Sequence, residues 1–128
     1  MELTGFVAVG AGGALGCWLR WGLGLLLNPR FPSVPLGTLL ANLAGGFAMG
    51  CLLALFEHSP LLPPALRLFL LTGFLGGLTT FSTFSAEACT LLLRHRYGWF
   101  AAHVTVHLAG SLAMTATGLL LTRHLLNL

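Results

Sequence analysis

Four long apolar stretches, at about residues 3–27, 36–56, 65–93 and 99–121, make up nearly the whole chain. Each is long enough for a transmembrane helix, because a helix needs about 20 apolar residues to cross the hydrocarbon core of a bilayer. Only 7% of the 128 residues are charged, which is too few to cover the surface of a soluble domain, where about 25% are charged. We therefore predict one all-α integral membrane domain over residues 1–128, with four spans.

The composition also excludes several function classes. The six basic residues are all Arg and are scattered, so the basic stripe of a nucleic-acid-binding protein is missing. Three cysteines are too few, and odd in number, for a secreted disulfide scaffold. The sequence has no acid pair, no nucleophile elbow and no zinc-protease motif, so we predict that the protein is not an enzyme.

The third stretch carries the run Gly-Gly-Leu-Thr-Thr at residues 76–80, near its middle. This run predicts a break in the helix at about the membrane midplane. Non-helical backbone is tolerated at that depth only where it is buried in protein or lines a cavity. The free carbonyl groups of such a break suit a monovalent cation such as Na⁺. The alternative is a glycine kink that a neighbouring helix fills.

Isolated polar side chains also lie inside the stretches, where a polar group is costly. Arg20 either snorkels to the interface or faces a hydrated vestibule. Glu87 is either a hydrogen-bonded structural carboxylate, which we favour, or part of a proton relay. Asn42 either holds helices together or offers its N–H donors to an anion, and the sequence does not decide between these roles.

Two further patterns lie on helix faces. Phe81 and Phe84 are three residues apart, which usually indicates packing, although the positive edges of two rings could also hold an anion. The fourth stretch carries a polar stripe at a spacing of four: His103, His107, Ser111 and Thr115. A His pair at this spacing can bind a metal, but no acidic or cysteine ligand accompanies it, so we favour a row of donors along a narrow path.

The glycine pairs and the distribution of Arg between the two membrane faces indicate how the protein packs and assembles. Gly12/Gly16, Gly46/Gly50 and Gly73/Gly77 have the small-xxx-small spacing that lets helix backbones approach closely. With four spans, Arg67 and Arg123 lie near one membrane face, and Arg30, Arg94 and Arg96 near the other. Because two Arg on one side and three on the other hardly favour one orientation, the chain could insert both ways up and form an antiparallel homodimer.

Three runs resemble motifs of the CrcB/Fluc family of fluoride channels, and they are spread over much of the chain. They are GGALGCWLRW at residues 12–21, GTLLANLAGGF at residues 37–47 and GFLGGLTTFSTFSAE at residues 73–87, of which the third is the most specific. Some positions differ from the family pattern. Cys17, Trp21 and Gly46 replace Ala, Tyr and Ser, while His103 and His107 stand where Asn is common, and His can titrate near neutral pH.

The resemblance implies a passive, fluoride-selective channel of the cell inner membrane that lowers cytoplasmic fluoride. It implies an antiparallel, dual-topology homodimer in membrane lipid, with the third helix broken mid-membrane. The implied pore residues are Asn42, Phe81, Ser82, Phe84, Ser111 and Thr115, with Arg20 in the vestibule and His103, His107 and Glu87 as further lining candidates. The backbone carbonyls of Gly76 and Thr79 would hold a structural Na⁺ at the dimer centre.

Two other functions are weighed against this one. A small dual-topology proton-coupled multidrug exporter would need a central carboxylate in its first span, and this chain has Arg20 there instead. A purely structural membrane subunit would have no reason to keep a broken helix beside a polar stripe.

Overall fold

The computed structural model describes residues 2–128, and within that range it contains helices and no strands. The helices are α1 (Leu3–Leu27), α2 (Leu36–His58), α3 (Pro64–Arg67), α4 (Gly76–Leu78), α5 (Phe81–Leu93) and α6 (Tyr97–Leu125). A 3₁₀ turn, Asn28–Arg30, follows α1, and a π-helical segment, Leu68–Leu75, joins α3 to α4.

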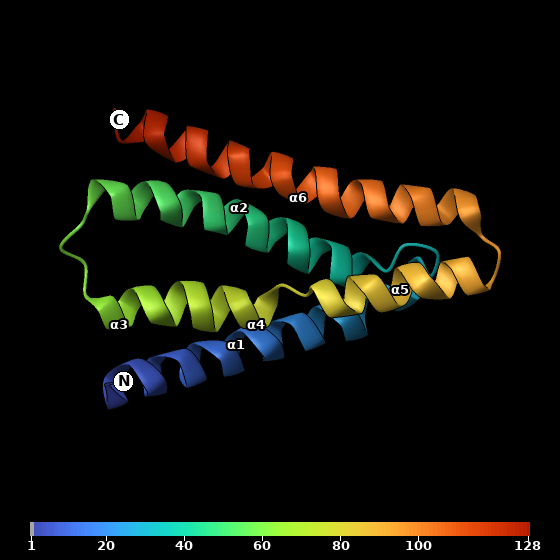
Figure 1. The fold of residues 1–128 in the computed structure, drawn as a ribbon, viewed down its shortest axis with the longest axis horizontal. Coiled ribbons are helices and arrows are strands. Elements are labelled where there is room, and N and C mark those ends of the chain that lie inside the picture. Colours follow the sequence, from blue (N-terminus) through green and yellow to red (C-terminus); the bar gives the residue numbers. More distant parts are fainter. Residues whose placement is uncertain (1) are drawn as a thin grey trace.

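The helices form four spans that are long and apolar enough to cross a membrane: Leu3–Arg30, Leu36–His58, Pro64–Leu93 and Tyr97–Leu125. The predicted all-α, multi-pass membrane protein is therefore confirmed. The fourth span is longer than predicted at both ends. The beginning of α1 and the end of α6 lie at the same end of the bundle, as four crossings require (Figure 1).

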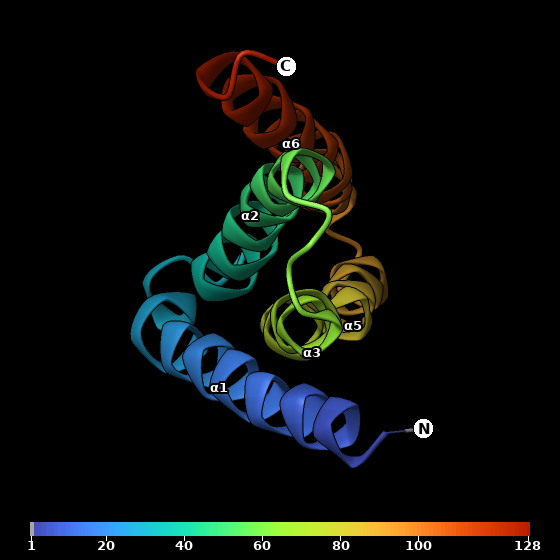
Figure 2. The same ribbon diagram turned by 90° about the vertical axis from the view of Figure 1, so that its left-hand side faces the viewer.

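The spans pack as two close pairs. The α2 helix runs along α6, and α1 runs along the π-helical segment and α4. Seen from the end, α6 and α2 form one row, while α1 and the third span lie below it (Figure 2). The α5 half of the third span turns towards α6, which it contacts. The polar residues of α2, α5 and α6 are thereby brought to one region.

Glycines make the α2–α6 contact possible. A Cβ on Gly50 would overlap the carbonyl oxygen of Thr115, and one on Gly118 would overlap that of Phe47. A Cβ on Gly46 would lie 3.1 Å from the carbonyl oxygen of Ser111. These two backbones thus approach more closely than any larger residue would allow.

The same device joins α1 to the third span. A Cβ on Gly12 would meet the carbonyl oxygen of Phe69, and one on Gly16 would meet that of Phe74. In return, Gly73 lies against the backbone of α1. A Cβ on Gly73 would lie 3.0 Å from the Cα atom of Gly12. The close packing predicted for at least two of the three glycine pairs is therefore confirmed.

The third span is interrupted between α4 and α5. Thr79 and Thr80 have extended backbone, with ψ angles of 153° and 119°. The Thr80 hydroxyl oxygen then accepts the backbone N–H of Thr83 at 3.1 Å, so Thr80 is the N-cap that starts α5. Gly76 and Gly77, which the sequence placed inside the break, are helical. The non-helical part is therefore shorter than predicted.

The glycine contacts lead to a stability prediction. Gly50→Ala should lower the melting temperature in detergent, because the added Cβ meets backbone rather than a movable side chain, and overpacking typically costs about 1–3 kcal/mol. Gly22→Ala is the matched control. Apart from the adjoining backbone of its own helix, no atom lies within 4 Å of a Cβ at Gly22, so this change should be neutral or slightly stabilising in a helix. Equal melting temperatures for the two variants would contradict the α2–α6 contact.

Candidate functional site

A groove of about 470 Å³ lies between α2, the third span and α6, and it is open on one side. Its lining brings together many of the side chains and backbone groups that the sequence singled out: Asn42, Gly76, Thr79, Phe81, Phe84, His107, Ser111 and Thr115. Four other predicted residues, Arg20, Ser82, Glu87 and His103, lie outside this lining. The groove is therefore the candidate functional site.

Asn42 clamps the interruption of the third span. Its Oδ1 accepts the backbone N–H of Thr80 at 2.7 Å, and its Nδ2 donates to the Thr80 carbonyl at 3.0 Å. Because a backbone N–H only donates and a carbonyl only accepts, these contacts fix the orientation of the amide. Its second N–H then faces Nδ1 of His107, 3.1 Å away. The contacts thus favour the helix-holding role of the two that the sequence left open.

The interruption redirects the hydrogen bonds of the helix. In a continuous α-helix, the N–H groups of Thr80 and Thr83 would bind the carbonyls of Gly76 and Thr79, four residues earlier. Here these N–H groups bind the Asn42 side chain and the Thr80 hydroxyl instead. The two carbonyls that lose their usual helical donors are those to which the family resemblance assigned a structural Na⁺.

Arg20 has a role that the sequence did not suggest. Its Nε donates to the carbonyl of Gly77 at 2.9 Å, so α1 supplies a donor to the last turn before the interruption. The partners are 57 positions apart, and no local pattern could have indicated the pairing. An Arg inside a membrane span is tolerated when such a partner is present.

The two phenylalanines share the groove but differ in exposure. Their ring centroids lie 5.4 Å apart, and the rings are tilted by 53°. Phe84 is 6% exposed and stacks on the His103 ring, whereas Phe81 is 70% exposed. Phe84 is therefore part of the packing between α5 and α6, while most of the Phe81 ring is uncovered in the single chain.

The polar stripe of α6 is divided between two environments. Ser111 and Thr115 line the groove, and the Thr115 hydroxyl donates to the Ser111 carbonyl at 2.9 Å within the helix. His103 is fully buried at the other end of the stripe. Ser82, on α5, is exposed, with its hydroxyl oxygen 3.4 Å from that of Thr80.

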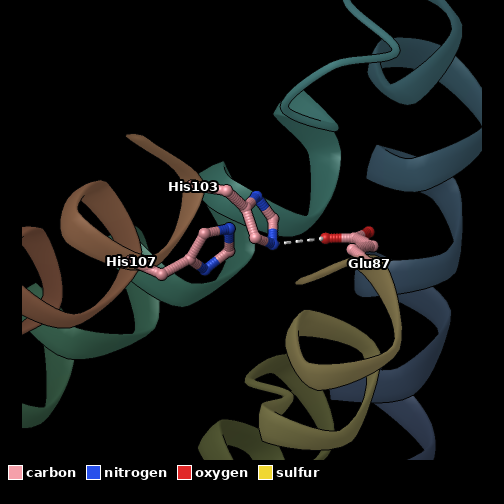
Figure 3. A group of neighbouring side chains, drawn as sticks. All are labelled: Glu87, His103 and His107. Carbon is pink, nitrogen blue, oxygen red and sulfur yellow. Dashed lines mark ion pairs between the residues drawn. The ribbon is translucent and has the colours of Figure 1, made fainter. Parts of the chain in front are cut away.

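A compact polar cluster lies beside the groove, with His103 between His107 and Glu87 (Figure 3). The Thr38 hydroxyl donates to Oε1 of Glu87 at 2.6 Å, the kind of contact that a structural carboxylate makes. The other carboxylate oxygen lies 3.4 Å from Nε2 of His103. The sequence showed no acidic ligand beside the two histidines, because Glu87 comes from a different helix and only the α5–α6 contact brings it there.

Comparison with known proteins gives consistent matches. Residues 7–119 match the sequence model of a family described as CrcB-like protein, Camphor Resistance (CrcB). A protein of Nitrosospira multiformis named fluoride-specific ion channel FluC is 56% identical over 125 residues, which are 98% of each chain. A protein of the same name from Aromatoleum aromaticum is 60% identical over 117 residues, covering 91% of this chain and 89% of the relative. Another protein of this name, from Pseudomonas putida, is 55% identical over 117 residues, covering 91% of this chain and 92% of the relative.

Proposed function

The chain belongs to the CrcB family, and on this premise we propose that it is a fluoride-selective channel through which fluoride leaves the cell passively. The chemistry of the groove supports this proposal independently of the names of the chain's relatives. Among residues 2–128, those lining the groove offer amide, hydroxyl and ring-edge groups but include no Asp, Glu, Lys or Arg.

Fluoride is small and strongly hydrated, so its water must be replaced by several hydrogen-bond donors. A fixed positive charge in a narrow path would trap the ion, whereas conduction requires binding that is favourable yet weak enough for release. Uncharged donors and the positive edges of aromatic rings meet both conditions. The lining of the groove has this intermediate character.

Individual residues have defined parts in this proposal. The second Asn42 N–H now faces Nδ1 of His107, so an ion in the groove would compete with that nitrogen for the same donor. Phe81 and Phe84 present ring edges, and the Ser111 hydroxyl continues the track in the groove. The exposed Ser82 hydroxyl would extend the track beyond the groove lining, and the Thr115 hydroxyl would join it by turning its proton from the Ser111 carbonyl to the ion. Arg20 attracts anions at the vestibule while its Nε stays on Gly77.

The assembly that we propose is an antiparallel homodimer in the cell inner membrane. In a single chain the groove is open on one side, and Phe81, which lines it, is largely uncovered. A second, inverted copy would close this side and place the interruption of each third span near the membrane midplane. The carbonyls of Gly76 and Thr79, which lack their usual helical donors, would then surround a shared Na⁺ from both chains.

The function is tested by flux from liposomes that contain only this protein. With valinomycin to carry the K⁺ counter-charge, KF-loaded liposomes should release fluoride, and KCl-loaded liposomes should retain chloride. Phe84→Ile, which removes a ring edge but keeps an apolar side chain, should release fluoride more slowly. Equal release of the two anions would rule out selectivity. Extrusion of an organic cation driven by a proton gradient would instead indicate the exporter.

The antiparallel assembly is tested by topology. In a background in which Cys17, Cys51 and Cys89 are replaced by Ala, a single Cys added after Leu128 should be labelled from both sides of the membrane, because the near balance of Arg lets copies insert both ways up. A membrane protein that inserts in one known orientation, with its added Cys on the cytoplasmic side, serves as the control for leakage of the label. Labelling from one side only would contradict the antiparallel dimer.

A further inference from the structure

We propose that Glu87, His103 and His107 form a binding site for a divalent transition-metal cation such as Zn²⁺, next to the groove. The inference concerns the cluster drawn in Figure 3, of which the proposed fluoride function uses only the groove-lining residue His107. Binding of the cation stands independently of fluoride conduction, whereas its effect on flux rests on the proposed function.

The ligand set and its geometry suit such a cation. One ligand atom from each of the three residues lies within 4.8 Å of the others. His103 and His107 share one face of α6, since they are four residues apart, and the carboxylate arrives from α5. Two histidines and one carboxylate are a set that holds zinc in proteins with a fourth position open.

The cluster also contains buried atoms that need a partner. Oε2 of Glu87, Nδ1 of His103 and Nε2 of His107 are buried without a hydrogen-bond partner among the described residues. An unsatisfied polar atom in a buried site is destabilising. A cation bound by Oε2 of Glu87 and Nε2 of His107 would satisfy two of these three atoms.

The contacts around the ligands favour metal binding at Glu87 but not at His107. The Thr38 hydroxyl holds Oε1 of Glu87, which leaves Oε2 directed to the cluster. Ligating histidines normally donate their other N–H to an acceptor, and loss of such a partner lowers metal affinity by about 10–100-fold. Nδ1 of His107 instead faces a donor, the Asn42 amide. The site should therefore be weaker than a structural zinc site and be occupied when metal is added.

Metal binding at this site should change the hydrogen bonding and the charge of the groove. While Nδ1 of His107 accepts the Asn42 N–H, the proton of the neutral ring lies on Nε2. For Nε2 to bind the metal, this proton must move to Nδ1, which ends the contact with Asn42. Because His107 lines the groove, the cation can enter there, and it would then place positive charge beside the path of the anion. Metal should therefore slow fluoride release.

The test is a titration of the purified, untagged full-length protein with Co²⁺, whose absorption bands report bound His and carboxylate ligands. The cysteine-free background removes competing thiols. One cation per chain should bind, and Zn²⁺ should displace it. His103→Asn and Glu87→Gln should each abolish saturable binding, and Thr38→Val should weaken it by about 10–100-fold. His124→Asn, an exposed histidine outside the cluster, should bind like the parent.

Flux gives the second readout, with variants first shown to elute like the parent in gel filtration. Zn²⁺ should slow fluoride release by the parent and by His124→Asn, but not by Glu87→Gln. Absence of saturable binding, or binding that survives both cluster variants, would overturn the site. Binding without slower release would overturn the coupling to the groove. If the metal-free parent releases no fluoride, the channel proposal fails, while the Co²⁺ titration still decides the metal site.

Discussion

The candidate site depends on the hydrogen bonds between the Asn42 amide and the backbone of Thr80. Extended residues within a membrane span leave N–H and C=O groups without helical partners, and in an apolar environment these groups must be satisfied inside the protein. Asn42 provides both a donor and an acceptor to Thr80 from α2, while Arg20 provides a donor to Gly77 from α1. Two polar residues that would be costly elsewhere in a span thus stabilise the interruption.

These side-chain-to-backbone hydrogen bonds require closely packed helices, and the glycines allow that packing. An amide side chain can reach backbone on a neighbouring helix only when the two axes are close. Gly12 and Gly16 bring α1 against the third span, and Gly50 and Gly118 bring α2 against α6. The packing and the polar contacts are therefore parts of one arrangement. Its consequence for function is a groove whose uncharged donors are held by closely packed helices.

Hydropathy and local spacing predicted the four spans, the membrane class and the close glycine contacts. The grouping of Asn42, Phe84 and Ser111 followed only from the resemblance to the CrcB/Fluc family. The sequence overestimated the break, because Gly76 and Gly77 are both helical, and Gly77 packs on α1, where a Cβ would lie 2.5 Å from the carbonyl oxygen of Gly13. It could not predict the Arg20–Gly77 contact or the position of Glu87 beside His103, since spacing shows which residues share a helix face but not which helix lies opposite.

The central claim, that Asn42 holds the interruption of the third span, is tested most directly by hydrogen exchange at the Thr80 amide in lipid nanodiscs. In the parent this amide should be protected. In Asn42→Leu it should exchange about 5–150-fold faster, as expected when a buried donor loses a hydrogen bond worth about 1–3 kcal/mol. The amide of Thr105 in α6 should be unchanged. Equal protection of Thr80 in the two proteins would contradict the account.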